Sequence, residues 1–327
     1  MTMAMRDHGG NIDWAINHFG GKPEAWIDLS TGINRCPYPV PAIAPGAWCG
    51  LPTQSSLDAL HEVARTAYAT RAPILATAGA QAAIQAFPRL SPPGRARVLA
   101  PTYNEHAGSL RACGWQVTDV RDLSALAGAD LAVVVNPNNP DGERHDPAAL
   151  LALAGRVGRL VVDESFADPY PELSLARAVG QPGLLVLRSF GKFYGLAGVR
   201  LGFVLGGDDD LATMATHQGP WAVSGPAIAI GTAALADIGW ATRTRDRLAR
   251  DAARLDQLAE ATSWRLVGGS NLFRLYDMDD AHDAQNRLAQ AQIWTRSFPW
   301  SKRWLRLGIP GKQPEWDRLA SALRCRP

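Results

Sequence analysis

The segment Ser189-Phe-Gly-Lys-Phe-Tyr-Gly-Leu-Ala-Gly-Val-Arg-Leu-Gly202 decides how the rest of this sequence is interpreted. It follows an apolar run that predicts a strand, and its glycines permit close approach of the backbone to a ligand. It presents the hydroxyl of Ser189, the amine of Lys192 and the guanidinium of Arg200. Loops at the carboxyl ends of strands are where α/β proteins place ligands. We therefore predict a ligand-binding loop in which Ser189 and Arg200 hold a phosphate; the alternative is a surface loop with a solvated lysine.

Lysine is scarce in this chain, which narrows the search for an amine nucleophile. Of the 33 basic residues only four are lysines, namely Lys22, Lys192, Lys302 and Lys312. Lys192 lies between aromatic and small residues, where removal from water favours the neutral, nucleophilic amine. The other three lie in polar contexts, so we expect Lys192 to be the reactive amine.

The pattern of apolar runs predicts an α/β fold with a mostly parallel central sheet covered by helices. Runs such as 131–135, 160–163 and 184–187 are nearly continuous in branched apolar residues and alternate with helical stretches, as in sheets buried on both faces. The length of 327 residues suits one large domain and a smaller one. We expect an N-terminal arm of little regular structure over 1–45, a large domain over 46–225, and a linking helix with a small α/β domain over 226–327.

Composition excludes several classes of function. A net charge of +2 gives no electrostatic footprint for a nucleic acid or an anionic membrane. The four cysteines are scattered, so neither a disulfide framework nor a metal site is expected. No run of 18 apolar residues and no apolar signal sequence is present, and we expect a cytoplasmic protein.

The Lys192 segment resembles the lysine motif of fold-type-I pyridoxal-phosphate (PLP) enzymes, the aspartate aminotransferase superfamily, in the form typical of its histidinol-phosphate aminotransferase branch. The resemblance implies that PLP is bound covalently by Lys192. Two further motifs match in order and spacing, Asn136-Pro-Asn-Asn-Pro-Asp-Gly142 and Val161-Val-Asp-Glu-Ser-Phe166. In the resembling family Asn139 contacts the PLP 3′-oxygen and the substrate, and Asp163 pairs with the pyridine nitrogen.

The resemblance extends to the remaining cofactor contacts and to the substrate carboxylate. Gly79, Ala80 and Gln81 look like the family's phosphate cup, where a glycine turn opens a helix. Tyr103 falls where the family stacks an aromatic ring on PLP, and we count it with Lys192 and Asp163 as catalytic. Arg306 resembles the arginine that forks onto the substrate α-carboxylate.

Two N-terminal motifs narrow the resemblance. His8-Gly-Gly-Asn11 and Asp28-Leu-Ser-Thr-Gly-Ile-Asn34 are similar to the opening of the L-threonine-O-3-phosphate decarboxylases of cobalamin biosynthesis. A histidine beside two glycines can form a turn that holds a substrate phosphate. We therefore expect these segments to bind substrate through His8, Gly9, Asn11, Ser30, Gly32, Ile33 and Asn34.

Two departures from the family pattern and two alternative functions stay open. Phe166 stands where the aminotransferases usually have a tyrosine that bonds PLP, and Leu51 where relatives often have a tyrosine that reaches the partner subunit. The family implies a homodimer. The enzyme alternative is a histidinol-phosphate or related aminotransferase, because the same residues serve both reactions. The other alternative is a PLP-fold binding or regulatory protein without catalysis.

Overall fold

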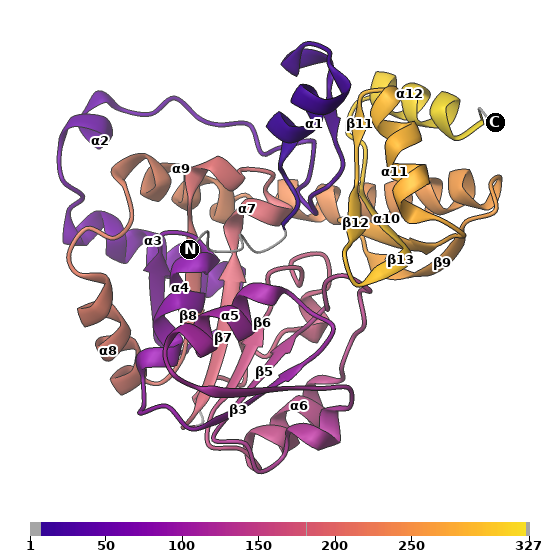
Figure 1. Ribbon diagram of the computed structural model, residues 1–327. Helices are drawn as coiled ribbons and strands as arrows, with labels where there is room; N and C mark the ends of the chain where they lie inside the picture. Colours follow the sequence, from indigo (N-terminus) through magenta and orange to yellow (C-terminus); the bar gives the residue numbers. More distant parts are fainter. Residues whose placement is uncertain (1–7, 181, 325–327) are drawn as a thin grey trace. The chain divides into compact units, whose positions relative to one another are not determined.

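The computed structural model describes residues 8–180 and 182–324, which form two compact units (Figure 1). The large unit comprises residues 38–139 and 143–242. The small unit comprises residues 8–37, 140–142 and 243–324. Residues 38–45 and 226–242 thus belong with the large unit, and the N-terminal segment 8–37 belongs with the C-terminal part of the chain.

A seven-stranded mixed sheet forms the centre of the large unit, in the order β2-β8-β7-β6-β5-β3-β4. Strands β3 to β7 pair in parallel, whereas β8 runs antiparallel to β7 and β2. The strands are β2 (Ile74–Thr77), β3 (Arg95–Leu99), β4 (Gln116–Val120), β5 (Leu131–Val135), β6 (Leu160–Asp163), β7 (Leu184–Ser189) and β8 (Gly202–Leu205). This arrangement confirms the predicted α/β class with a mostly parallel sheet.

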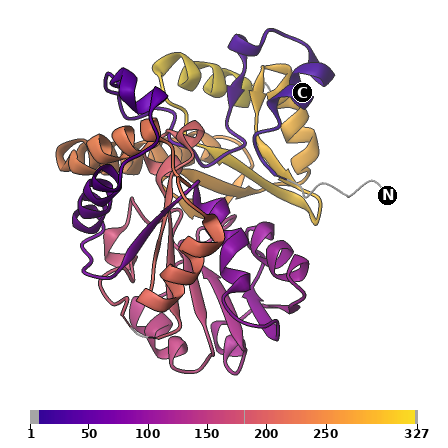
Figure 2. The same ribbon diagram turned by 90° about the vertical axis from the view of Figure 1, so that its left-hand side faces the viewer.

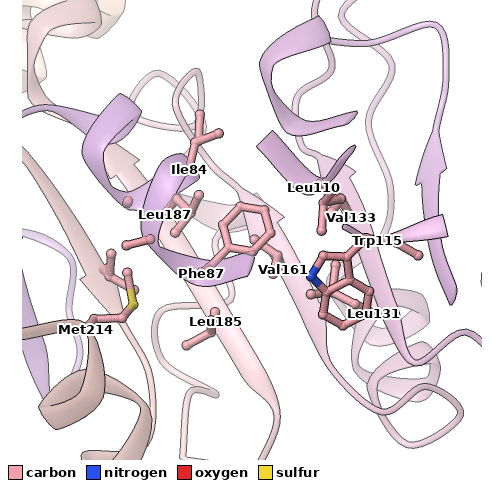
Figure 3. Packing of buried hydrophobic residues seen from close by; sticks show 14 of the residues in the cluster. Ile84, Phe87, Leu110, Trp115, Leu131, Val133, Val161, Leu185, Leu187 and Met214 are labelled. Carbon is pink, nitrogen blue, oxygen red and sulfur yellow. The ribbon is translucent and has the colours of Figure 1, made fainter. Parts of the chain in front are cut away.

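Helices lie on either side of these strands (Figure 2). The large unit contains α2 (Pro45–Cys49), α3 (Gln54–Ala67), α4 (Ala80–Ala86), α5 (Asn104–Ala112), α6 (Pro147–Ala154), α7 (Phe190–Phe193), α8 (Asp208–Gln218) and α9 (Gly225–Ala236). Figure 3 shows Ile84 and Phe87 packed with strand residues such as Leu187 and Val161 in the core. Burial of these apolar side chains is the main force that fixes the helices on the sheet.

Strands β5, β6 and β7 place reactive side chains at one edge of the sheet, because they are parallel neighbours in close register. Val135 pairs with Asp163, and Asp163 pairs with Leu187, so the three strands end almost level. Asn139 follows the first strand, Asp163 ends the second and Lys192 follows the third. Residues far apart in sequence therefore meet at the carboxyl edge.

The segment predicted as a loop around Lys192 is partly helical. Strand β7 extends to Ser189, and Lys192 lies in the short helix α7, followed by a 3-10 turn at Ala197–Val199. The glycine-based prediction was wrong here because Phe190 and Phe193 are fully buried and anchor one helical turn before the glycines of 195–202.

The small unit is built on a four-stranded antiparallel sheet in the order β12-β13-β10-β9. A separate parallel pair joins β1 to β11, so that Ile27 pairs with Ile293. The elements are α1 (Ile12–Phe19), β1 (Ile27–Asp28), β9 (Arg265–Ser270), β10 (Phe273–Asp277), α11 (Ala281–Gln290), β11 (Ile293–Trp294), β12 (Arg296–Phe298), β13 (Ser301–Gly308) and α12 (Gln313–Arg324). Most of α10 (Ile238–Glu260) also belongs to this unit.

The N-terminal segment has more regular structure than we expected from its glycines and prolines. Helix α1 begins after Asn11, whose side chain accepts a hydrogen bond from the Trp14 N–H, as an N-cap residue does. Ala15 is fully buried on its inner face. The apolar residues at 12, 15, 16 and 19 carry the helical spacing that predicts this element. Among all helices of residues 8–180 and 182–324, none is both long and apolar enough to cross a bilayer.

Candidate functional site

One pocket of the large unit gathers the residues that the sequence analysis assigned to the cofactor. All nine line it: Gly79, Ala80, Gln81, Tyr103, Asn139, Asp163, Ser189, Lys192 and Arg200. They come from the start of α4 and the turn before it, the residue before α5, the segment after β5, the ends of β6 and β7, helix α7 and the segment after α7. Sequence reasoning missed several apolar lining residues, including Ile84 and Leu201.

Asp163 is a buried carboxylate with a defined set of donors. Its Oδ2 lies 2.8 Å from Nε2 of His106, and its Oδ1 accepts from the Ser165 hydroxyl at 2.5 Å and the Ser165 N–H at 2.9 Å. Burial alone would raise the pKa of Asp163, but the hydrogen bonds and charge of His106, with the Ser165 donors, outweigh it and lower this pKa. Asp163 is therefore ionised at neutral pH.

His106 is a functional residue that the sequence analysis missed. It is fully buried on α5, three residues after Tyr103, and it contacts Asp163 from 57 positions away in sequence. The only signal in the sequence is helical spacing, which puts residues 103 and 106 on one face of α5.

Gly79 and Arg200 form a cradle at one end of the pocket. Gly79 has a φ of +76°, and a Cβ built there would lie 2.7 Å from Nη2 of Arg200. Only glycine lets the guanidinium approach the turn this closely. Arg200 itself has a φ of +56°, and its Nη1 donates to the Ala197 carbonyl at 3.1 Å. Backbone strain of this kind concentrates at ligand sites.

Gln81 bridges two side chains of the same pocket wall. Its Nε2 donates to Glu105 at 2.8 Å, and its Oε1 accepts from the Tyr103 hydroxyl at 3.3 Å. An ionised carboxylate only accepts hydrogen bonds, so Glu105 fixes the orientation of this amide. The hydroxyl proton of Tyr103 is therefore directed at Gln81.

Lys192 projects from α7 into this pocket beside an aromatic ring. Its Nζ lies 5.7 Å from the centroid of the Phe166 ring. Phe190 and Phe193 on either side of it are fully buried, and Phe190 stacks on Tyr194 with centroids 4.6 Å apart. The helix that carries the amine is thus held by aromatic packing.

The chemistry of this donor set suits PLP. A primary amine, an ionised buried carboxylate and a glycine cradle under a guanidinium line one cavity. These groups match an aldehyde carbon, a protonated pyridine nitrogen and a phosphate, respectively. Lys192, Asp163, and Gly79 with Arg200 are the residues that would hold the cofactor.

A buried ion cluster lies directly behind the pocket. Arg188 precedes Ser189 and donates from Nη1 to Glu164 at 2.8 Å and from Nη2 to Asp168. Glu164 follows Asp163 in sequence, so the cluster joins the ends of β6 and β7. Burial raises the pKa of Glu164, and attraction by Arg188 opposes that rise.

In the small unit, the two N-terminal motifs contact each other. The Gly10 N–H donates to the Ser30 hydroxyl at 2.7 Å, and that hydroxyl donates to Asp28 at 2.6 Å. A Cβ at Gly9 would lie 2.3 Å from the Ser30 carbonyl oxygen, so only glycine fits there. His8, Gly9, Asn11 and Ser30 line one cavity.

Arg306 lies beside this cavity and faces another arginine. It is 6% exposed, its Nη2 donates to the Ser30 carbonyl at 2.7 Å, and its cross-strand partner is Arg296. Burial and repulsion by Arg296, partly offset by Asp28, lower the pKa of Arg306 to about 9. Like charges directly opposite each other destabilise a sheet, so this pair favours an anion. Arg296, which lines the cavity, gave no distinguishing signal among the many arginines of the sequence.

The other residues assigned to the substrate lie nearby in the chain but do not line that cavity. Asn34 is buried, and its Oδ1 accepts from Nη2 of Arg247 at 2.7 Å and from the Cys36 N–H at 3.0 Å. Gly32 is buried and Ile33 half-buried. These contacts give Asn34 a role in holding the segment, while its part in substrate binding stays a prediction.

Comparison with known proteins identifies the family of this chain. The chain is 44% identical over 324 residues to a threonine-phosphate decarboxylase of a Sinorhizobium species, covering 97% of both chains. It is also 44% identical to the threonine-phosphate decarboxylase of Pseudomonas aeruginosa, covering 98% of this chain and 97% of the other. The fold matches the histidinol-phosphate aminotransferase of Sinorhizobium meliloti in complex with pyridoxal-5′-phosphate, with a TM-score of 0.82, 20% identity and coverage of 98% and 94%. Residues 50–323 match the model of one family, and this chain belongs to it: aminotransferase class I and II.

Proposed function

We propose that this protein is a PLP-dependent decarboxylase that converts L-threonine O-3-phosphate into (R)-1-amino-2-propanol O-2-phosphate and CO2. The observation that carries the proposal is the pair of facing arginines in the small unit, Arg306 and Arg296, beside the cavity of His8 and Ser30. Relatives 44% identical over nearly their full length carry the name threonine-phosphate decarboxylase. By the same resemblance we place the reaction in cobalamin biosynthesis.

The large unit provides the residues for the cofactor. When bound, PLP supplies a conjugated ring that accepts the electron pair released as the bond between the substrate Cα and its carboxylate breaks. Lys192 would hold the cofactor through its amine, and the same amine would return a proton to Cα of the substrate. Asp163, ionised and held by His106, would keep a proton on the pyridine nitrogen. Asn139 would be the donor for the 3′-oxygen, because Phe166 has no hydroxyl.

The small unit provides the residues for the substrate. Arg306 binds the α-carboxylate, and Arg296 with the turn from His8 to Asn11 binds the phosphate. A hydrogen bond to a charged group contributes about 1.5–3 kcal/mol. We therefore expect plain L-threonine to bind at least about tenfold more weakly than its phosphate ester.

The decisive experiment measures CO2 release from L-threonine O-3-phosphate by purified holoenzyme without any oxo acid. We expect release in that mixture and little release from L-threonine. If no CO2 is released while histidinol phosphate and 2-oxoglutarate yield glutamate, the protein is an aminotransferase instead. A protein that binds PLP but supports neither reaction would be a binding or regulatory module.

Lys192→Ala tests the site itself. The folded variant should lose both turnover and the visible absorption of lysine-bound PLP, because no other amine lines the pocket among the described residues. Lys302→Ala is the matched control and should retain both. A PLP adduct on Lys22, Lys302 or Lys312 would refute the assignment.

We infer that the protein acts as a homodimer. The support is the family match, together with Trp48, Leu51 and Trp221, three large apolar side chains that the large unit leaves exposed. Sedimentation should give twice the chain mass of 35.1 kDa. Full activity at the monomer mass would refute the homodimer.

The scattered free cysteines Cys36, Cys49 and Cys113 support a cytoplasmic location.

A further inference from the structure

Asp28 is an acidic residue of the small unit to which the proposed function gives no part. It is not among the described residues that line the cavity of His8 and Ser30. Its Oδ1 accepts two hydrogen bonds from Ser30, one from the N–H at 2.9 Å and one from the hydroxyl at 2.6 Å. An aspartate that bonds the backbone two residues further on forms a compact local turn. Asp28 therefore fixes both the main chain and the side chain of Ser30.

Ser30 connects Asp28 to the N-terminal turn over residues 8–11. It is fully buried, and its hydroxyl accepts a hydrogen bond from the Gly10 N–H at 2.7 Å. A serine hydroxyl has a single proton, and here that proton is donated to Asp28, so the oxygen presents its lone pairs to Gly10. Hydrogen bonds to a carboxylate are stronger than those between neutral groups. The hydrogen-bonded chain from Asp28 through Ser30 to Gly10 thus fastens the turn in one orientation.

The same serine contacts Arg306 through its main chain. The Ser30 carbonyl accepts a hydrogen bond from Nη2 of Arg306 at 2.7 Å. The neighbouring Leu29 is held on both sides, because its N–H donates to the Trp294 carbonyl and its carbonyl accepts from the Gly308 N–H, each at 2.7 Å. With the main chain held in this way, the side chain of Ser30 is the adjustable link between the turn and Arg306.

We propose that Asp28 is a positioning residue for substrate recognition, which acts through the Ser30 hydroxyl to align the turn over residues 8–11 with Arg306. This inference rests on the proposed function, which assigns the substrate carboxylate to Arg306 and its phosphate to the turn. A ligand with two anions binds well only when both sites are aligned in advance, because misplacing one site forfeits its hydrogen bonds. L-Threonine carries only the carboxylate and has no such requirement.

The first test compares Asp28→Ala with Asp28→Asn in the holoenzyme. Asp28→Ala removes the acceptor and should raise the KM for L-threonine O-3-phosphate about tenfold. The KM for L-threonine should change little, and so should kcat, since the residues for the cofactor lie in the large unit. Asp28→Asn keeps an oxygen in the place of Oδ1 and should restore most of the lost affinity.

Asp28→Asn also distinguishes positioning from a direct effect of charge. Asp28 attracts Arg306, and this attraction partly offsets the lowering of the Arg306 pKa. The asparagine substitution removes the attraction but retains an acceptor for Ser30. If Asp28→Asn is as impaired as Asp28→Ala, the charge of Asp28 acts on Arg306 directly, and positioning through Ser30 is refuted.

A double variant tests the hydrogen-bonded chain itself. Gly9→Ala displaces the turn directly, because its Cβ would lie 2.3 Å from the Ser30 carbonyl oxygen. If Asp28 acts through the turn, Gly9→Ala should raise the KM for the phosphate ester much less in the Asp28→Ala background than in wild type. Equal fold-increases in the two backgrounds would mean that the residues act independently, which contradicts the proposal.

Thermal unfolding separates positioning from a loss of stability. Asp146→Ala is the matched control, because Oδ1 of Asp146 likewise accepts from a backbone N–H at 2.9 Å, that of Ala148 in the large unit. Both alanine variants should lower the Tm by a few degrees. Only Asp28→Ala should reduce the rise in Tm that inorganic phosphate produces. If the phosphate-dependent rise is the same in both variants, Asp28 has a structural role alone.

The outcomes separate this inference from the proposed function. If Asp28→Ala binds the phosphate ester as wild type does, while His8→Ala and Arg296→Met bind it poorly, the role of Asp28 is refuted alone. If none of the three variants weakens binding, the placement of the phosphate at the turn is refuted. Should Asp28→Ala not fold, Ser30→Ala breaks the same chain of hydrogen bonds at its next link and gives the same comparison.

Discussion

Nε2 of His106 lies 2.8 Å from Oδ2 of Asp163, and this contact keeps a fully enclosed carboxylate in its ionised form. In wild type the lowered pKa of Asp163 means that its contribution is lost only when the pH falls through that low value. Without His106, burial would dominate and raise the pKa of Asp163. The pairing with the PLP nitrogen would then fail at a higher pH as the solution is acidified.

We therefore predict that, on acidification, PLP affinity falls at a higher pH in His106→Phe than in wild type; the acid limb is this fall in affinity. Absorbance titration from neutral to acidic pH measures it. His61→Phe is the control, since His61 accepts from the Ala76 N–H at 3.2 Å outside the pocket. It should lower stability without moving that limb. An unshifted limb in His106→Phe would show that His106 does not tune Asp163.

Gly79→Ala should weaken PLP binding about tenfold or more, because its Cβ would displace the Arg200 guanidinium from the cradle. Gly128→Ala has almost the same φ, +77° against +76°, but open space around the added Cβ. Both variants should lose similar stability from backbone strain, and only Gly79→Ala should lose PLP affinity. Equal PLP affinity in the two variants would contradict the cradle.

Arg188→Met should reduce the free energy of unfolding by about 3–5 kcal/mol, because it leaves Glu164 and Asp168 buried without their cation. Arg303→Met removes the half-exposed partner of Asp277 and should change the free energy of unfolding far less. The pKa of Glu164 is already raised and would rise further in Arg188→Met. Since a carboxyl with a raised pKa is tolerated when protonated, the deficit should shrink as the pH is lowered. Urea unfolding at several pH values measures both effects.

Gly9→Ala should raise the KM for L-threonine O-3-phosphate, because the added Cβ would meet the Ser30 carbonyl at 2.3 Å and detach the N-terminal turn. Gly207→Ala places its Cβ in open space and should behave as wild type. We expect the ratio of the KM values for L-threonine and its phosphate to fall severalfold in Gly9→Ala alone. An unchanged ratio would remove the turn from the phosphate site.

The pocket of the large unit was predictable because its residues follow the fold class directly. Asn139, Asp163 and Lys192 each end or follow an apolar run, and parallel strands bring such positions to one edge. His106 was not predictable in this way, since its contact with Asp163 depends on how α5 packs on the sheet. Arg296 required the register of β12 against β13, which shifts at Ser297 and Phe298 and leaves no trace in residue type.

The small unit draws together chain segments made at very different times. Ser30 accepts a hydrogen bond from Arg306, 276 positions later in the sequence, and β1 has only β11 as its partner strand among the described residues. Ribosomes add roughly 5–20 residues per second, so the N-terminal segment spends on the order of ten seconds or more without this partner. The large unit, nearly continuous in sequence, has all its strands long before that. Capacity to hold the cofactor is therefore acquired first during synthesis, and recognition of a doubly anionic ligand comes only with the last segment of the chain.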